Sequence, residues 1–188
     1  ERNEQSKQDH AKPKSRSHRS AEDKPRRSSR LGHPVRCLEE EAKDQYFTVT
    51  AADRAMPAMV GWHPWFRRRL LQDRSVEVVL RFDAGKMYER DESMVPSGRL
   101  VDPSPGPWDD CFTEVDQPLT LEWPGAVELS LTSSCDHWVV YNRRPDGVCV
   151  EPQSDGPDAF NRVPRVLRPG ETLSEIYTIA WRLSGDIP

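Results

Sequence analysis

The sequence predicts an all-β fold, built as a sandwich or a barrel of short strands. Segments rich in β-branched and aromatic residues recur along the chain, and turns containing Pro and Gly separate them. No segment places apolar residues at helical spacing between an N-cap and a C-cap. The chain has 188 residues, which is enough for one domain with a hydrophobic core.

The first 44 residues form a basic, low-complexity tail that we expect to be disordered. Residues 1–36 contain 11 Lys/Arg and 5 Asp/Glu, a net charge of +6, and almost no apolar side chains. Because the whole chain has a net charge of −4, residues 37–188 carry −10. Such a tail buries too little apolar surface to offset the entropy of ordering. Within it Leu38–Lys43 could form one turn of helix, and we place the β-domain at residues 45–188.

The composition also limits location and partners. No apolar run is long enough to span a bilayer, and the N-terminus lacks the apolar region of a secretory signal. The four cysteines show neither CxxC nor Cys/His zinc spacing, so we expect no metal site. Because no secretory signal is visible, we expect reduced thiols and a cytoplasmic location. The tail could bind nucleic acid by charge, but it has no aromatic residue to stack on bases. We therefore predict no specific nucleic-acid partner.

Eight strands are predicted after the tail. Apolar and polar residues alternate in several of them, most clearly in residues 118–131, where Pro124-Gly125 marks the turn of a β-hairpin. The connections 91–108 and 152–169 are predicted to be irregular, and a loop as long as 91–108 usually carries a site or lies disordered. The predicted strands are residues 46–50, 75–82, 86–90, 118–123, 127–131, 137–141, 147–151 and 172–183.

The stretch Gly61–Phe66 is the first candidate for a functional site. It places His63 between two tryptophans and before Pro64, which biases the histidine towards an extended backbone. Histidine exchanges protons near neutral pH, and the indole faces of Trp62 and Trp65 could exclude water or stack on a sugar ring. Core packing around a hydrogen-bonded histidine explains the same residues equally well.

Carboxylates elsewhere are the candidate partners of this histidine. Glu151 closes the apolar run Val148–Val150, where its carboxylate is either solvent-exposed or held in a cleft. In a cleft, desolvation would raise its pKa and make it a better base. Asp109 and Asp110 follow the Pro-rich connection, where paired aspartates on a solvated turn are the ordinary interpretation. His137 begins a predicted strand, and we interpret it as structural or surface-exposed.

Other chemistries lack their characteristic residues. The sequence has no Gly-rich phosphate loop, no dinucleotide-binding fingerprint and no GxSxG nucleophile motif. Proton transfer without a cofactor, or binding of a polar ligand on aromatic surfaces, is what remains.

Four stretches, taken in order, resemble the aldose 1-epimerase (mutarotase) family. The resemblance covers residues 46–188. The stretches are Gly-Trp-His-Pro-Trp-Phe (61–66), Trp-Asp-Asp-Cys-Phe-Thr (108–113), Val-Cys-Val-Glu-Pro-Gln (148–153) running on to Gly-Pro-Asp-Ala-Phe-Asn (156–161), and Leu-Arg-Pro-Gly-Glu (167–171).

The resemblance implies an antiparallel β-supersandwich of the galactose mutarotase type that interconverts the α and β anomers of an aldohexose without a cofactor. In the family, the histidine that matches His63 protonates the ring oxygen. The glutamate that matches Glu151 removes the proton of the anomeric hydroxyl. The ring opens, C1 rotates, and the ring closes on either face.

The resemblance also implies the groups that bind the sugar. Asp109 matches the aspartate that binds sugar hydroxyls, and Gln153 lies where it could assist the glutamate. Trp62, Trp65 and Phe112 are the expected aromatic walls. The run Arg67–Arg69 either binds a sugar phosphate or forms a solvated basic turn.

The chain departs from the family pattern on its N-terminal side. Family members carry additional N-terminal strands, with an arginine and a second histidine that help to bind the substrate. We therefore expect a fold that is incomplete at the N-terminus and that forms a homodimer through an open sheet edge. The alternative to an enzyme is a truncated, non-catalytic β-sandwich that binds carbohydrate weakly.

Overall fold

A computed structural model describes residues 41–70 and 76–183 of the chain, and nearly all its secondary structure there is antiparallel β-sheet. The described strands are β1 (Glu41–Thr50), β2 (Met56–Pro57), β3 (Trp65–Arg67), β4 (Val79–Arg81), β5 (Ala84–Arg90), β6 (Pro96–Val101), β7 (Asp109–Val115), β8 (Leu119–Trp123), β9 (Val127–Ser133), β10 (His137–Tyr141), β11 (Gly147–Gln153), β12 (Val166–Leu167) and β13 (Thr172–Leu183). The one described helix, α1 (Ala159–Arg162), has four residues.

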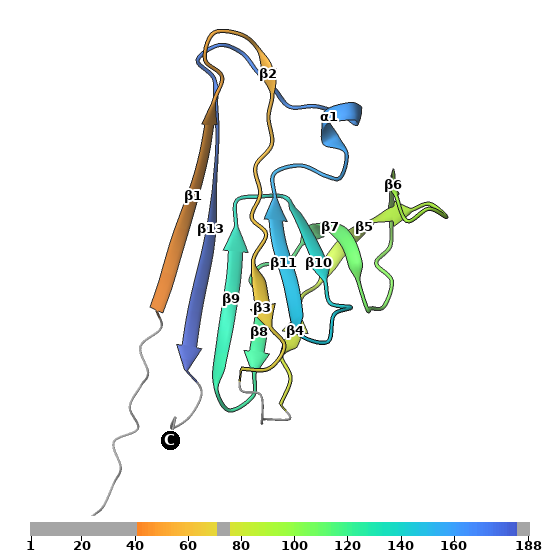
Figure 1. Cartoon of the computed structure of the whole chain (residues 1–188), viewed down its shortest axis with the longest axis vertical. Helices are drawn as coiled ribbons and strands as arrows, with labels where there is room; N and C mark the ends of the chain where they lie inside the picture. The colour runs from red at the N-terminus through yellow and green to blue at the C-terminus, as the bar shows by residue number, and fades with distance from the viewer. Residues whose placement is uncertain (1–40, 71–75, 184–188) are drawn as a thin grey trace, which may run out of the picture. The chain divides into compact units, whose positions relative to one another are not determined.

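Two large sheets carry the fold (Figure 1). The first has the order β1-β13-β9-β8-β4, and the second has the order β3-β11-β10-β7-β5-β6. All pairs in both sheets are antiparallel. A small third sheet pairs β12 with β2. The predicted all-β sandwich is confirmed.

The main core lies between the two large sheets. Alternate residues of β8 supply Leu119 and Leu121, and β13 supplies Tyr177. The second sheet supplies Trp138 from β10 and Val150 from β11. Because side chains alternate between the faces of a strand, the neighbours of these β10 and β11 residues lie on the opposite, outer face of the second sheet.

The first strand shows how tertiary pairing decides the structure of a polar segment. Glu41–Thr50 contains mostly polar residues, yet it pairs with β13 along its whole length. Side-chain hydrogen bonds support this register, including Thr48 Oγ1 to Ser174 Oγ at 3.0 Å and Thr50 Oγ1 to Thr172 Oγ1 at 2.9 Å. The predictions of a disordered tail over residues 41–44 and of a helical turn over Glu41–Lys43 were wrong, because these residues belong to β1. The rest of the predicted tail, residues 1–40, lies outside the described residues.

Most predicted strands are confirmed, including the hairpin of β8 and β9, the pair β10 and β11, and the final strand β13. Three predictions were wrong. The connection 91–108 contains β6, an edge strand in which Pro96 and Gly98 are tolerated although they are typical of turns. Asp109 and Asp110 begin β7 and do not lie on a solvated turn. The connection 152–169 contains α1 and β12.

The predicted strand 75–82 is shorter in the structure, where β4 comprises only Val79–Arg81 and Ser75 lies outside the described residues. Within the described part of the chain, no helix has the length and apolar character needed to cross a membrane.

Candidate functional site

The candidate site lies on the outer face of the second sheet, and strand β11 divides its side chains between this face and the core. Val148 and Val150 are buried in the core between the sheets. Cys149, Glu151 and Gln153 therefore point to the opposite face. This alternation places a thiol, a carboxylate and an amide in a row along one strand.

The segment before β3 runs alongside β11 and alternates in the same way. Trp62 and Phe66 pack against the core, whereas His63 and Trp65 face the outer side. Trp65 is opposite Cys149 in the register, and Gly61 bridges to Gln153. His63 is thereby brought opposite Glu151.

Gly61 is needed where the two segments meet. A Cβ atom at this position would lie 3.1 Å from the carbonyl oxygen of Pro152. The adjacent backbone N–H of Trp62 donates to that same oxygen at 3.0 Å. The absence of a side chain at Gly61 therefore lets the histidine segment approach β11 closely.

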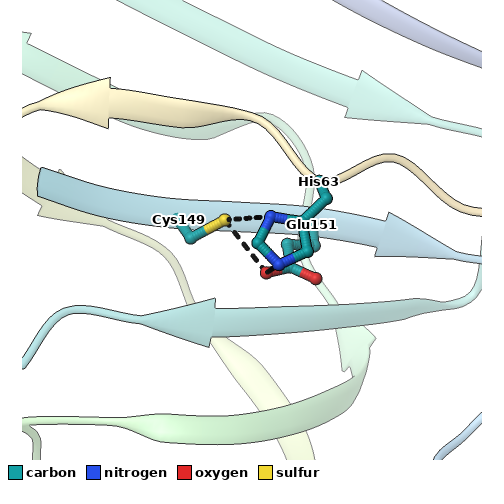
Figure 2. Close-up of side chains that lie close together, drawn as sticks. All are labelled: His63, Cys149 and Glu151. Carbon is teal, nitrogen blue, oxygen red and sulfur yellow. Dashed lines mark hydrogen bonds and ion pairs between the residues drawn. The ribbon is translucent and has the colours of Figure 1, made fainter.

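His63, Cys149 and Glu151 converge on one point of the sheet (Figure 2). His63 Nε2 lies 3.2 Å from Glu151 Oε1, and Cys149 Sγ lies 2.9 Å from the same oxygen. His63 Nδ1 lies 3.3 Å from Cys149 Sγ. The predicted acid and base are therefore neighbours in the structure, although 88 positions separate them in the sequence.

The two members of the acid–base pair differ in exposure. The side chain of His63 is 65% exposed, whereas that of Glu151 is 8% exposed. Gln153 Nε2 lies 3.4 Å from Glu151 Oε2, so the amide lies beside the carboxylate. A shielded carboxylate beside an accessible imidazole is an arrangement that can pass a proton to a ligand arriving from solvent.

The surroundings of Cys149 favour the protonated thiol over the thiolate. Burial, together with the hydrogen bond to Glu151, raises the pKa of its thiol far above the ordinary value. Its Sγ lies 2.9 Å from the carbonyl oxygen of Pro64 as well as 2.9 Å from Glu151 Oε1. One thiol proton therefore faces two acceptor oxygens.

Trp65 and Tyr141 provide the aromatic surface next to His63. The rings of Trp65 and His63 lie 5.9 Å apart at 32°, and the rings of Trp65 and Tyr141 lie 5.7 Å apart at 75°. Trp65 is 49% exposed, and the Arg144 guanidinium lies 5.8 Å from the centre of its ring. Tyr141 was not among the predicted site residues, although the alternation of β10 would have placed it on this face.

Trp62 and Phe112 lie away from this surface. Trp62 contacts Tyr177 at a ring distance of 5.7 Å and Phe47 at 6.4 Å, both in the first sheet. Phe112 is 1% exposed and packs edge-on against Phe82. Of the three expected aromatic walls, only Trp65 shares a face with His63.

Asp109 lies on the same face, two strands from Cys149. It is opposite Tyr141 in the register, and Tyr141 is opposite Cys149. Two strand spacings put the backbones of Asp109 and Cys149 about 10 Å apart. The Arg90 guanidinium lies 3.3 Å from Asp109 and 2.8 Å from the buried Asp110, so a single cation holds both aspartates.

His137 continues the row on the far side of Gln153, its partner in the register. Its Nε2 lies 3.1 Å from the hydroxyl of Tyr88, and burial lowers the pKa of His137. This bonding fits the structural interpretation made from the sequence.

Two of the three consecutive arginines have structural partners. Arg68 donates to the carbonyl oxygens of Asn142 and Arg144, and both Arg68 and Arg69 pair with Glu77. These contacts favour the basic-turn interpretation over a phosphate site.

Comparison with known proteins shows similarity of the fold. No family model matches the chain, and no curated protein matches it. Among solved structures, the chain is similar to a galactose mutarotase-like protein from Clostridium acetobutylicum, with a TM-score of 0.64, 16% identity, and coverage of 74% of this chain and 52% of that one.

Two further structures agree. A proposed aldose 1-epimerase from Escherichia coli gives a TM-score of 0.62 at 17% identity, covering 76% of this chain and 56% of that one. An aldose epimerase homologue from Caenorhabditis elegans gives 0.59 at 15% identity, covering 78% and 57%. The chain thus spans little more than half the length of the structures it matches. Its fold is that of the galactose mutarotase-like β-sandwiches.

Proposed function

We propose that this protein is an aldose 1-epimerase that interconverts the anomers of an aldohexose, with His63 as the acid and Glu151 as the base. The observation that carries the proposal is the 3.2 Å distance between His63 Nε2 and Glu151 Oε1 on the outer face of the sheet. The fold neighbours are aldose 1-epimerases and galactose mutarotase-like proteins, which supports the same reaction class.

The spacing of the two groups suits the reaction. The ring oxygen and the anomeric oxygen of a pyranose are bonded to the same carbon, so an acid and a base that serve them must lie close together. His63 donates a proton to the ring oxygen while Glu151 removes the proton of the anomeric hydroxyl. The C1–ring oxygen bond breaks, a free aldehyde forms, and C1 rotates. The reverse transfers then close the ring and restore both groups.

The neighbouring residues supply a surface for the sugar. Trp65 and Tyr141 offer apolar ring faces beside His63, and they contact each other. Asp109, about 10 Å from the β11 backbone, can accept hydrogen bonds from hydroxyls at the other side of the ring. Its pairing with Arg90 fixes the direction of that carboxylate. Gln153 orients Glu151 from the remaining side.

The exposure of His63 favours a second candidate, a β-sandwich that binds sugar without catalysis. Because its side chain is 65% exposed, the described residues leave the imidazole largely open to water. General acid catalysis gains from a drier site, in which hydrogen bonds are stronger. The chain also spans little more than half of its structural neighbours.

We further propose that the protein acts on its sugar in the cytoplasm, with no cofactor and no specific nucleic-acid partner. The location is supported by the free cysteines in the described part of the chain. The mechanism needs only a proton donor and a proton acceptor, and the basic tail has no aromatic residue to stack on bases.

Polarimetry on freshly dissolved α-glucose and α-galactose tests the proposal. A positioned acid or base contributes about 10²- to 10⁴-fold in rate, so His63→Ala and Glu151→Gln should each slow anomerisation by that order. The matched control is Glu128→Gln, which removes a carboxylate from β9 of the first sheet and should leave the rate unchanged.

Unchanged rates in both site variants would refute the assignment. An inactive wild-type protein that still binds sugar in titration calorimetry would establish the binding alternative instead.

A further inference from the structure

Several atoms that carry lone pairs surround the Cys149 thiol at the centre of the site. Cys149 Sγ is surrounded by His63 Nδ1 at 3.3 Å, Glu151 Oε1 at 2.9 Å and the carbonyl oxygen of Pro64 at 2.9 Å. The thiol has one proton to share between the two oxygens. Four atoms of the types that coordinate metals therefore face one small volume.

The separations among these atoms are close to those of a metal site. Typical Zn²⁺ bond lengths of about 2.3 Å to sulfur and about 2.0–2.2 Å to nitrogen and oxygen, in tetrahedral geometry, separate the ligand atoms by roughly 3.3–3.6 Å. The ligand atoms of His63, Cys149 and Glu151 all lie within 4.8 Å of one another. A shift of a few tenths of an ångström in each of Cys149 and Glu151 would bring their ligand atoms to the separation of a Zn²⁺ site. The exposed ring of His63 can move with them.

We propose that His63, Cys149 and Glu151 form a Zn²⁺-binding site, and that bound Zn²⁺ blocks proton transfer by the same residues. Thiolate and imidazole ligands select a borderline-soft cation such as Zn²⁺ over Mg²⁺ or Ca²⁺. Zn²⁺ displaces the thiol proton to solvent and binds the sulfur, a ring nitrogen of His63 and a carboxylate oxygen. The fourth position, on the solvent side, takes a water molecule.

The site is built by two adjacent segments in register. Cys149 and Glu151 are two residues apart on β11 and share a face, and His63 lies opposite them on the segment held by the Gly61–Gln153 bridge. Figure 2 shows the imidazole next to the Glu151 carboxylate, with the Cys149 sulfur beside the ring. Ligands placed on paired strands need little reorganisation to bind a cation, which favours affinity.

Titration calorimetry of the full chain with ZnCl₂ in a non-chelating buffer at neutral pH tests the site, with no sugar present. Loss of even an outer partner of a ligand costs about 10- to 100-fold in metal affinity, so Cys149→Ser should weaken one site by more than about 100-fold. His63→Asn should remove the same site. Cys135→Ser is the matched control, since this buried thiol lies in the turn before β10, and its titration should equal that of the wild type.

Co²⁺ in place of Zn²⁺ gives a second readout. A thiolate-to-Co²⁺ charge-transfer band should appear in the wild type and in Cys135→Ser, and be absent in Cys149→Ser. If Cys149→Ser does not fold, the exposed position of His63 makes His63→Asn the deciding variant. Zn²⁺ titrations of Cys149→Ser or His63→Asn that match the wild type would overturn the proposal.

The inhibitory part rests on the proposed function and is tested separately. One equivalent of Zn²⁺ should stop wild-type anomerisation, and a chelator should restore it. A protein that is inactive but binds Zn²⁺ through Cys149 would refute the epimerase assignment and leave the metal site standing. An active protein that binds no Zn²⁺ through Cys149 would refute the metal site and leave the epimerase assignment standing.

Discussion

The two faces of the second sheet differ in what holds their side chains. On the inner face, Trp138, Val148 and Val150 pack against the first sheet and are almost completely buried. On the outer face, His63, Glu151 and Trp65 are held by hydrogen bonds and ring contacts, with solvent beside them. One set of strands thus gives stability on one side and accessible chemistry on the other, and substitutions on the two faces should have separable effects.

The largest expected effect is on stability, from Trp138→Ala. This side chain is fully buried, and removing a buried Trp costs about 3–5 kcal/mol of unfolding free energy. Trp65→Ala is the matched control on the other face, where half of the ring is exposed. Urea denaturation should show a large loss for Trp138→Ala only, whereas sugar binding should weaken in Trp65→Ala. Equal losses of stability would contradict the separation of the two faces.

Arg90→Leu should affect both properties to a smaller extent. It leaves the buried Asp110 without its cation, which costs about 1–3 kcal/mol, and it frees Asp109 from its ion pair. We expect a lower urea midpoint together with a raised KM at nearly constant kcat.

Arg99→Leu is the control for Arg90→Leu, because the Arg99–Glu89 pair is largely exposed and should contribute little. A KM unchanged in Arg90→Leu would show that Asp109 does not bind the sugar.

The pH dependence of stability should report on His137. Burial lowers the pKa of this histidine in the folded protein, so below its ordinary value near 6.5 the unfolded chain binds a proton that the folded protein resists. Stability should therefore fall as the pH drops below about 6.5. Replacing His137 with Gln should reduce the change in the urea midpoint between pH 7 and pH 5. An unchanged slope would assign the dependence to other groups.

The smallest effect concerns the edge strand β1, where we place the predicted homodimer. Among the described residues, β1 has β13 on one side and no strand on the other, and its Tyr46 and Phe47 are exposed. Replacing both with Lys should shift sedimentation towards the monomer and leave anomerisation unchanged. A wild-type protein that sediments as a monomer at all concentrations would exclude this interface.

The sequence was sufficient to predict the strands whose own residues alternate, such as β8, β9 and β10. It was not sufficient for β6 and β7, because their Pro, Gly and Asp residues are typical of turns. Those strands form because neighbours in the sheet pair with them. Local pattern alone does not contain that information.

Local sequence pattern was also insufficient to predict all the residues around the candidate site. Motifs singled out His63 and Glu151 as candidates. The alternation of β10 could have added Tyr141, whereas the pairing of Arg90 with Asp109 becomes visible only in the structure. Cys149 is 86 residues from His63, so no metal-ligand spacing could show their proximity. Trp62 and Trp65 are the same residue type on either side of His63-Pro64. Only the alternation of this segment between the two faces shows that Trp62 packs in the core and Trp65 is exposed.

The two oxygens of Glu151 have unequal surroundings. Oε1 accepts the Cys149 thiol and faces His63, while Oε2 has only the longer contact to Gln153. The shorter contacts at Oε1 fix the direction of the whole carboxylate, and the longer contact from Gln153 leaves Oε2 less tightly held. The two oxygens of this carboxylate are therefore held to different degrees. The orientation of Glu151 depends on Cys149 and Gln153, two positions away on either side along β11, so substitutions in this one strand can change how the carboxylate is held.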